Sequence, residues 1–208
     1  MSTPAPGPDP ARLGEAAALI AGTRRITVFT GAGMSAESGV PTFRDALTGL
    51  WERFRPEDLA TPEAWQRDRE LVWSWYADRA AGIRQVSPNA GHRAVAALGE
   101  RLAARGGELT VVTQNVDDLH ERSGSPVASH LHGSLFAPRC EECGRPGDPE
   151  LAPAAQLPRC PHCDGALRPG VVWFGEMLPE ADWAAAEKAF DTAELVLVIG
   201  TSGVVYPA

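Results

Sequence analysis

Four cysteines constrain the fold of this chain more than any other feature of its sequence. They form two C-x-x-C pairs with 16 residues between the pairs: Cys140 and Cys143, then Cys160 and Cys163. This spacing is typical of a zinc ribbon, in which each of two knuckles donates two thiolates to one tetrahedral ion. Four thiolates complete the coordination shell, so we expect a structural Zn²⁺ with no position left for a substrate. The surrounding segment 138–170 is rich in proline and lacks helical periodicity, which predicts a loop-built module that depends on this metal.

Apolar runs alternate with helical patterns along the rest of the chain. Strands are predicted for residues 25–30, 109–113, 127–131 and 195–200, and the apolar run 171–174 predicts a return to this alternation. Strands separated by helices indicate an α/β fold with a Rossmann-type parallel sheet and right-handed crossovers.

Two insertions interrupt this alternation, and we expect them to form a smaller lobe in which a zinc ribbon packs with a helical module. Before the first strand, Asp9 and a following proline predict a helix that ends near Gly22, with Leu13 and Ile20 on an apolar face. The predicted organisation is a disordered tail at 1–8, a helical module at 45–85, a zinc-binding module at 138–170, and a discontinuous Rossmann-type nucleotide-binding domain at 9–44, 86–137 and 171–208.

Composition argues against several classes of protein. The 208 residues include 19 Lys and Arg against 27 Asp and Glu, a formal net charge of −8, whereas gripping nucleic-acid phosphates needs a surplus of cations. No run approaches the roughly 18 apolar residues of a membrane span, so we expect no membrane partner either. The first ten residues lack the basic start and apolar core of a signal peptide, and we therefore expect a cytoplasmic protein of unspecified oligomeric state.

A glycine-rich turn directly follows the first predicted strand. Gly31, Ala32 and Gly33, together with Ala36, match the G-x-G-x-x-G/A pattern of dinucleotide-binding folds. There the first glycine allows a tight bend, the second lets backbone N–H groups approach a pyrophosphate, and the small third residue lets helix and strand pack closely. The alternative is a glycine turn that binds nothing. The polar stretch 37–44 follows where a simple dinucleotide-binding fold would proceed to its second strand.

Polar side chains follow two further predicted strands. Gln114, Asn115 and Asp117 come directly after the strand 109–113, at the sheet edge where parallel folds bind ligands. They can hydrogen-bond an amide and ribose hydroxyls, although Asn115 and Asp117 could instead cap the next helix. His132 follows the short strand 127–131 and is the best-placed general base among the five histidines, with a structural histidine as the alternative.

Tyr76 and Arg79 are three residues apart in the helical insertion and therefore share one helix face. A phenol beside a guanidinium makes a fork suited to a carboxylate. On spacing alone, an ordinary solvated face remains the alternative.

Six motifs occur together in one order: GAGMSAESGVPTFR (31–44), TQNVDDLH (113–120), HG (132–133), the paired cysteine knuckles, VVWFGE (171–176) and GTS (200–202). From about residue 24 to its end the chain resembles the sirtuins, which are NAD-dependent protein lysine deacylases. The resemblance implies a Rossmann-type large domain and a small lobe that combines a zinc ribbon with a helical module.

The resemblance also implies roles for individual residues. His132 and Asn115 would be catalytic, with Gln114 on a ribose and Asp117 on the nicotinamide carboxamide. Residues implied to bind NAD are Gly31, Ala32, Gly33, Glu37, Thr42, Phe43, Arg44, Gln114, Asn115, Asp117, Gly200, Thr201 and Ser202. Residues implied to clamp the peptide as an added strand are Val172, Phe174, Gly175 and Glu176, with the segment 203–206 opposite.

The implied reaction consumes NAD and releases nicotinamide, free lysine and O-acyl-ADP-ribose, with His132 taking a proton from a ribose hydroxyl. Sirtuins that prefer acidic acyl groups carry Tyr-x-x-Arg where Tyr76 and Arg79 stand, and a small residue where Ala60 stands. The resemblance therefore implies removal of succinyl, malonyl or glutaryl groups in preference to acetyl from lysine in proteins or peptides.

Two other functions are consistent with the same residues. One is mono-ADP-ribosyl transfer from the same NAD site, and the other is a catalytically weak module that binds NAD or acyl-lysine. Sirtuins normally continue for some tens of residues beyond the position of Ala208, so we expect weak NAD affinity and low activity at this length.

Overall fold

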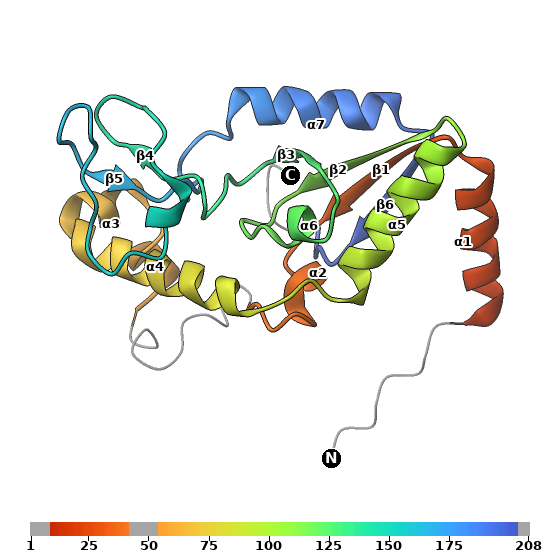
Figure 1. The fold of residues 1–208 in the computed structure, drawn as a ribbon, viewed down its shortest axis with the longest axis horizontal. Helices are drawn as coiled ribbons and strands as arrows, with labels where there is room; N and C mark the ends of the chain where they lie inside the picture. Colours follow the sequence, from red (N-terminus) through yellow and green to blue (C-terminus); the bar gives the residue numbers. More distant parts are fainter. Residues whose placement is uncertain (1–8, 42–53, 204–208) are drawn as a thin grey trace, which may run out of the picture.

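A four-stranded parallel sheet forms the centre of the large lobe (Figure 1). The computed structural model describes residues 9–41 and 54–203. The strands lie in the order β3-β2-β1-β6, and their bounds are Arg25–Thr30 for β1, Glu108–Thr113 for β2, Val127–His130 for β3 and Leu195–Ile199 for β6. These bounds agree with the predicted strands within one residue, and the parallel α/β fold class is confirmed.

Helices cover both faces of this sheet. On one face α5 (Ala90–Ala104) packs Val95 and Leu102 against buried residues of β1 and β2. The helix α7 (Glu180–Thr192) runs along the other face (Figure 1). There its Ala186 and Ala189 pack against Phe29 of β1 and Val112 of β2. The result is the three-layer arrangement expected of a doubly wound sheet.

The first helix, α1 (Pro10–Gly22), begins at the predicted Asp9 cap, where the carboxylate accepts the N–H of Ala11 (3.0 Å). The predicted helix is confirmed from its cap to Gly22, but no residue of its apolar face is buried, and Leu13 is 53% exposed. The helix is anchored by its C-terminal end instead. There the Arg105 guanidinium donates to the carbonyl oxygens of Ala21 (2.6 Å) and Thr23 (2.7 Å).

The small lobe combines helices with the two cysteine knuckles. Its helices are η2 (Pro56–Asp58), α3 (Pro62–Arg67) and α4 (Arg69–Gln85), and the knuckle module contains β4 (Arg139–Cys140), η3 (Pro149–Leu151) and β5 (Leu167–Arg168). Trp65, Trp73 and Trp75 are at most 2% exposed and form its core. The Trp73 indole donates to Ala154 O (2.8 Å), which ties α4 to the knuckle module.

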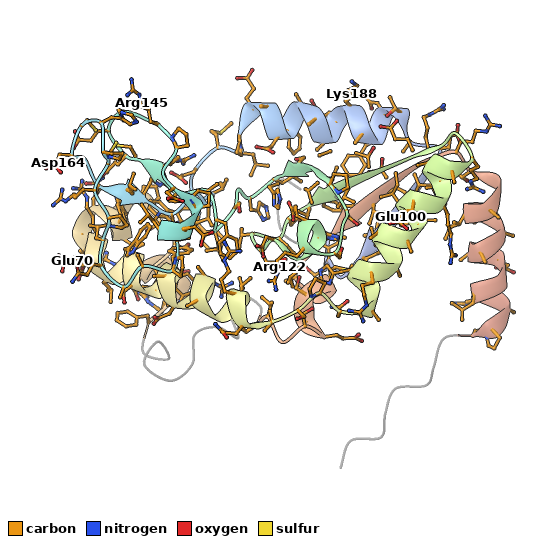
Figure 2. The ribbon with its side chains drawn as sticks, viewed as in Figure 1. Glu70, Glu100, Arg122, Arg145, Asp164 and Lys188 are labelled. Carbon is orange, nitrogen blue, oxygen red and sulfur yellow. The ribbon has the colours of Figure 1, made fainter. Side chains whose placement is uncertain are left out.

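Ion pairs connect α4 at both ends. At its beginning Arg69 Nη2 lies 2.9 Å from Glu141 Oε2 of the knuckle module. At its end Arg84 Nη1 lies 2.9 Å from Asp118, just before the short helix α6 (Leu119–Arg122) of the large lobe. Arg122, labelled in Figure 2, reinforces this contact by donating from Nη1 to Ile83 O (3.1 Å).

The apolar run 171–174 is not a strand of the sheet. Val171 makes a single antiparallel bridge with Gly133, and Trp173 is 2% exposed in the core of the small lobe. The run is apolar because it joins that core, which a pattern of apolar residues does not distinguish from a buried strand. Within the described residues, no helix is both long enough and apolar enough to cross a bilayer.

The packing of α5 predicts a contrast between two leucines on helices. Leu102→Ala removes a side chain with no exposed area, and we expect it to lower the free energy of unfolding by about 2–5 kcal/mol. Leu13→Ala, on the exposed face of α1, should change it by less than about 0.5 kcal/mol. Urea unfolding followed by circular dichroism measures both, and equal effects would contradict the assignment of these two faces.

Candidate functional site

The glycine turn between β1 and α2 (Gly33–Ala36) lies against the loop that follows β6. The N–H of Gly31 donates to Ile199 O (3.0 Å), and the N–H of Gly33 donates to Gly200 O (2.8 Å). A Cβ on Gly200 would lie 2.2 Å from Met34 N, and Gly200 has a positive φ of 67°. These glycines bring two backbones into contact. The Gly33 N–H, expected from the sequence to approach a pyrophosphate, is therefore satisfied inside the protein.

Buried polar side chains follow β2. Asn115 and Asp117 are 6% and 5% exposed. Asn115 Nδ2 donates to Ser35 Oγ (3.2 Å), and Ser35 Oγ donates to Asp117 Oδ2 (2.8 Å). Asp117 Oδ1 accepts the N–H of Leu119 (3.1 Å), so this carboxylate also caps the beginning of α6. Burial raises the pKa of Asp117, while the hydrogen bonds from Leu119 and Ser35 oppose that shift.

Hydroxyl groups at the strand ends hold the backbone of Asn115. Its N–H donates to Thr113 Oγ1 (3.0 Å), which also accepts the hydroxyl of Thr30 (2.7 Å). His120 Nε2 lies 3.1 Å from Thr30 Oγ1. All four residues are at most 6% exposed, so the chain of contacts is shielded from water.

His132 lies two residues beyond β3 with its ring turned toward β2. Its Nδ1 lies 3.0 Å from Gln114 O. Since a carbonyl oxygen only accepts, Nδ1 carries the proton and Nε2 keeps its lone pair. Burial lowers the pKa of His132, against the opposing effect of the Gln114 hydrogen bond. The neutral imidazole therefore predominates at pH 7 and can take up a proton at Nε2.

Two residues implied to bind NAD contact each other across the sheet edge. The Thr201 hydroxyl donates to Gln114 Oε1 (2.9 Å), and the Gln114 N–H donates to Thr30 O (2.9 Å). Of the other described residues of that set, the exposed ones are Ala32, Gly33, Glu37, Gly200 and Ser202.

The segment 171–176 joins His132 to the small lobe. The N–H of Val172 donates to His132 O (2.8 Å), and the N–H of Phe174 donates to Ala60 O (2.9 Å). The Trp173 indole donates to the hydroxyl oxygen of Tyr76 (3.1 Å). The residues expected to hold peptide and acyl group are therefore physically linked to the residue expected to act as base.

The side chain of Glu176, expected to clamp a peptide, is engaged within this segment. Both of its oxygens contact the Arg168 guanidinium, at 2.6 and 2.9 Å, and Oε2 also accepts the N–H of Trp173 (2.9 Å). Gly175 has a positive φ of 88°, and Phe174 is 57% exposed. The Glu176 carboxylate shapes the turn that presents Phe174.

A cavity of about 200 Å³ opens beside Arg79 on α4, between that helix and residues 40–41. The Arg79 Cζ lies 5.0 Å from the centroid of the Trp75 ring. Burial lowers the pKa of Arg79, while the nearby Tyr76 and Asp117 oppose that shift. Burial also raises the pKa of Tyr76, so its phenol stays protonated at neutral pH.

Three predicted NAD-binding residues, Thr42, Phe43 and Arg44, lie outside the described residues, as does the segment 204–206. Sequence reasoning assigned no role to Ser35 or to the two hydroxyls of Thr30 and Thr113. A recognisable signal existed for the two threonines, because each is the last residue of an apolar predicted strand.

The four cysteine sulfurs gather at one point. All lie within 4.8 Å of one another, with Cys140 and Cys163 3.4 Å apart and Cys143 and Cys160 3.7 Å apart. Zn–S bonds of about 2.3 Å in a tetrahedron place sulfurs about 3.8 Å apart, so the donor set fits Zn²⁺. The N–H of Cys143 donates to Cys140 Sγ (3.5 Å), a contact that favours the thiolate form which a metal needs.

This geometry predicts one tightly bound zinc per chain. Cys143→Ser should lose the ion and lower the melting temperature by roughly 10 °C or more, because metal binding contributes to folding. His162→Ala, an exposed residue within the second knuckle, should keep a full equivalent of zinc. Metal analysis by mass spectrometry and thermal unfolding measure both variants; full zinc in Cys143→Ser would contradict the four-thiolate site.

Comparison with known proteins places these features in a family. The Sir2 family model matches residues 31–207. The chain is 54% identical over 198 residues to NAD-dependent protein deacylase 1 of Pseudomonas aeruginosa, covering 91% of this chain and 78% of that protein. It is 51% identical over 199 residues to the NAD-dependent protein deacylase of Thermus thermophilus, covering 95% and 77%.

Solved structures agree with these relatives. A Sir2 homologue in complex with NAD superposes with a TM-score of 0.84 at 47% identity, covering 93% of this chain and 74% of that one. Sir2Tm bound to a propionylated peptide superposes with a TM-score of 0.76 at 29% identity, covering 94% and 78%. These matches show that the chain, with its glycine turn, buried Asn–Ser–Asp cluster and four-cysteine module, is a member of the Sir2 family.

Proposed function

We propose that this chain is an NAD-dependent protein-lysine deacylase in which His132 is the general base. The observation that carries the proposal is the position of the His132 ring, whose Nδ1 lies against Gln114 O. The distance between Nδ1 and Gln114 O is 3.0 Å, so Nδ1 donates its proton to this carbonyl and Nε2 is left to accept a proton from a substrate hydroxyl. The relatives named NAD-dependent protein deacylase support the same reaction class.

The polar cluster after β2 suits the nicotinamide end of NAD. An amide needs both a donor and an acceptor, and Asn115 and Asp117 supply an amide and a carboxylate held in place by Ser35. Bound there, NAD would supply an electrophilic ribose carbon and a ribose hydroxyl that can be deprotonated. The chain's part is to orient these groups beside His132 and to keep water out of a buried pocket.

The glycine turn and the loop after β6 suit the phosphate end. Gly31 packs against Thr201, whose hydroxyl contacts Gln114, and the neighbouring Ala32 is exposed to a ligand. The four-thiolate module would hold Zn²⁺ structurally, because its shell is closed by protein ligands. Thiolate ligands also favour a reducing compartment, in agreement with the expected cytoplasmic location.

We further propose that the enzyme prefers succinyl, malonyl or glutaryl groups over acetyl. Arg79 borders a cavity of about 200 Å³, and its charge lies close enough to Tyr76 and Asp117 to be influenced by both. Trp173 donates to the Tyr76 oxygen, so the phenol proton is left to donate to an acyl carboxylate beside the guanidinium. Ala60 is small, and its carbonyl fixes the neighbouring Phe174 backbone.

Removing the base tests the proposed reaction. His132→Ala should slow removal of the acyl group by about 10²-fold or more while NAD still binds, because the ring acts on the proton rather than on the dinucleotide. Mass spectrometry of acyl-lysine peptides and calorimetry with NAD measure the two effects, with His162→Ala as the control. Near-normal turnover by His132→Ala would refute its role, and nicotinamide release by the wild type without deacylation would favour ADP-ribosyl transfer.

Acyl preference is tested by removing the guanidinium. A charge-assisted contact contributes about 1.5–3 kcal/mol, so Arg79→Met should reduce kcat/KM for succinyl-lysine peptide by about one to two orders of magnitude relative to acetyl-lysine peptide. Arg12→Met, on the exposed surface of α1, is the matched control and should change neither. Equal losses of kcat/KM on both peptides would contradict the proposed contact of Tyr76 and Arg79 with an acyl carboxylate.

A further inference from the structure

His130, the last residue of β3, contacts an acceptor with each of its two ring nitrogens. Its Nδ1 lies 3.2 Å from Asn115 O, and its Nε2 lies 2.7 Å from Glu121 Oε1. A carbonyl oxygen and a carboxylate both accept hydrogen bonds and donate none. A neutral imidazole has a single N–H, so only the imidazolium form satisfies both contacts.

The surroundings of His130 favour this positive charge. Glu121 faces the ring from α6, Asp117 lies beyond it on the β2 side, and Asp182 of α7 accepts the His130 main-chain N–H (3.1 Å). Burial alone would lower the pKa of His130, but the hydrogen bond and charge of Glu121 outweigh it and raise that pKa. His120 of α6 stays neutral, because burial lowers its pKa to about 4.

The Asn115 carbonyl is one of three atoms that fix this residue in the site. Its Nδ2 is held by Ser35 and its N–H by Thr113, at 3.2 and 3.0 Å. Both of those partners are hydroxyls that do not titrate near neutral pH. The contact with His130 is therefore the one attachment of the three that depends on a proton.

We propose that His130 is a positioning residue, held as an imidazolium by Glu121, that fixes the peptide of Asn115 and makes the geometry of the site depend on a single proton. The consequence for the reaction rate rests on the deacylase activity proposed above, whereas the consequence for the Asn115 peptide does not. His130 touches neither substrate nor cofactor in this assignment and acts through Asn115.

Loss of that proton has a defined outcome. The shorter contact to a charged acceptor retains the remaining proton at Nε2, so Nδ1 presents a lone pair to Asn115 O and the attachment is lost. Because the pKa of His130 is raised, the attachment is complete below the ordinary histidine value and disappears as pH rises through the raised value. The base His132 remains neutral over that range, since its pKa is lowered.

Glu121→Gln separates this proposal from a simple effect of charge. A glutamine amide can donate to Nε2, so a neutral His130 can then keep its proton on Nδ1 and remain bonded to Asn115 O. The substitution should therefore lower the pKa of the ring and, at the same time, make the Asn115 attachment independent of pH. Glu100→Gln, on the exposed face of α5 (Figure 2), is the matched control.

Nuclear magnetic resonance tests the structural claim without any need for activity. In the wild type and in Glu100→Gln, both ring nitrogens of His130 should be protonated at pH 6.5, and the Asn115 carbonyl carbon should titrate with the same midpoint as the ring. In Glu121→Gln the ring midpoint should fall and the Asn115 carbonyl should stop titrating. The proposal would be overturned by a neutral His130 ring at pH 6.5. It would also be overturned if the Asn115 carbonyl carbon of the wild type did not titrate with the midpoint of that ring.

The pH profile of succinyl-lysine peptide turnover tests the consequence. We expect wild-type kcat to fall roughly threefold to tenfold above the His130 midpoint, with the peptide KM unchanged, and Glu121→Gln to lose this alkaline decline. His130→Gln should have a uniformly lower kcat at every pH. An alkaline decline that persists in Glu121→Gln would contradict the role of His130, whereas absent turnover with the expected resonance titrations would contradict only the proposed deacylase activity.

Discussion

The lateral register of the parallel strands determines where the site begins. Thr30 pairs with Ile199 on one side and with Thr113 on the other, and Thr113 pairs with His130, so four strands end along one row. Gly31, Gln114, Asn115, His132 and Gly200 all lie one or two positions beyond that row. Thr30 and Thr113 close the row with a buried hydroxyl pair 2.7 Å apart, which places polar contacts at the point where the apolar core stops.

Much of this arrangement could be predicted, because β1, β2 and β6 are runs rich in β-branched residues bounded by glycine and polar residues. The zinc module could be predicted as well, because two C-x-x-C pairs have few other structural uses in a reducing environment. The return to the strand pattern expected at 171–174 is wrong, because an apolar pattern reports which residues avoid water and not which neighbour covers them. For the same reason the pattern does not show that α1, which begins and ends as predicted, buries none of its residues. Sequence patterns also do not reveal that the Gly33 N–H is satisfied by Gly200 O, a contact between loops 167 residues apart.

Two histidines separated by one residue illustrate how neighbours set chemical behaviour. His132 faces one carbonyl and is otherwise buried, which favours a neutral ring, whereas His130 faces a carbonyl and a carboxylate, which favours a cation. The distinction rests on Glu121, a residue nine positions earlier that α6 brings back toward β3. No local pattern around either histidine contains that information, so tertiary contacts must supply it.

The helix α4 connects the cysteine module to the nucleotide-binding edge of the large lobe. Its 17 residues form a helix about 25 Å long. Near one end Arg69 forms an ion pair with Glu141, and near the other Arg84 forms an ion pair with Asp118. Arg79 lies between these two ion pairs on the same helix. Because Arg79 stands on the helix that joins the knuckle module to the large lobe, the position of its guanidinium at the cavity depends on both.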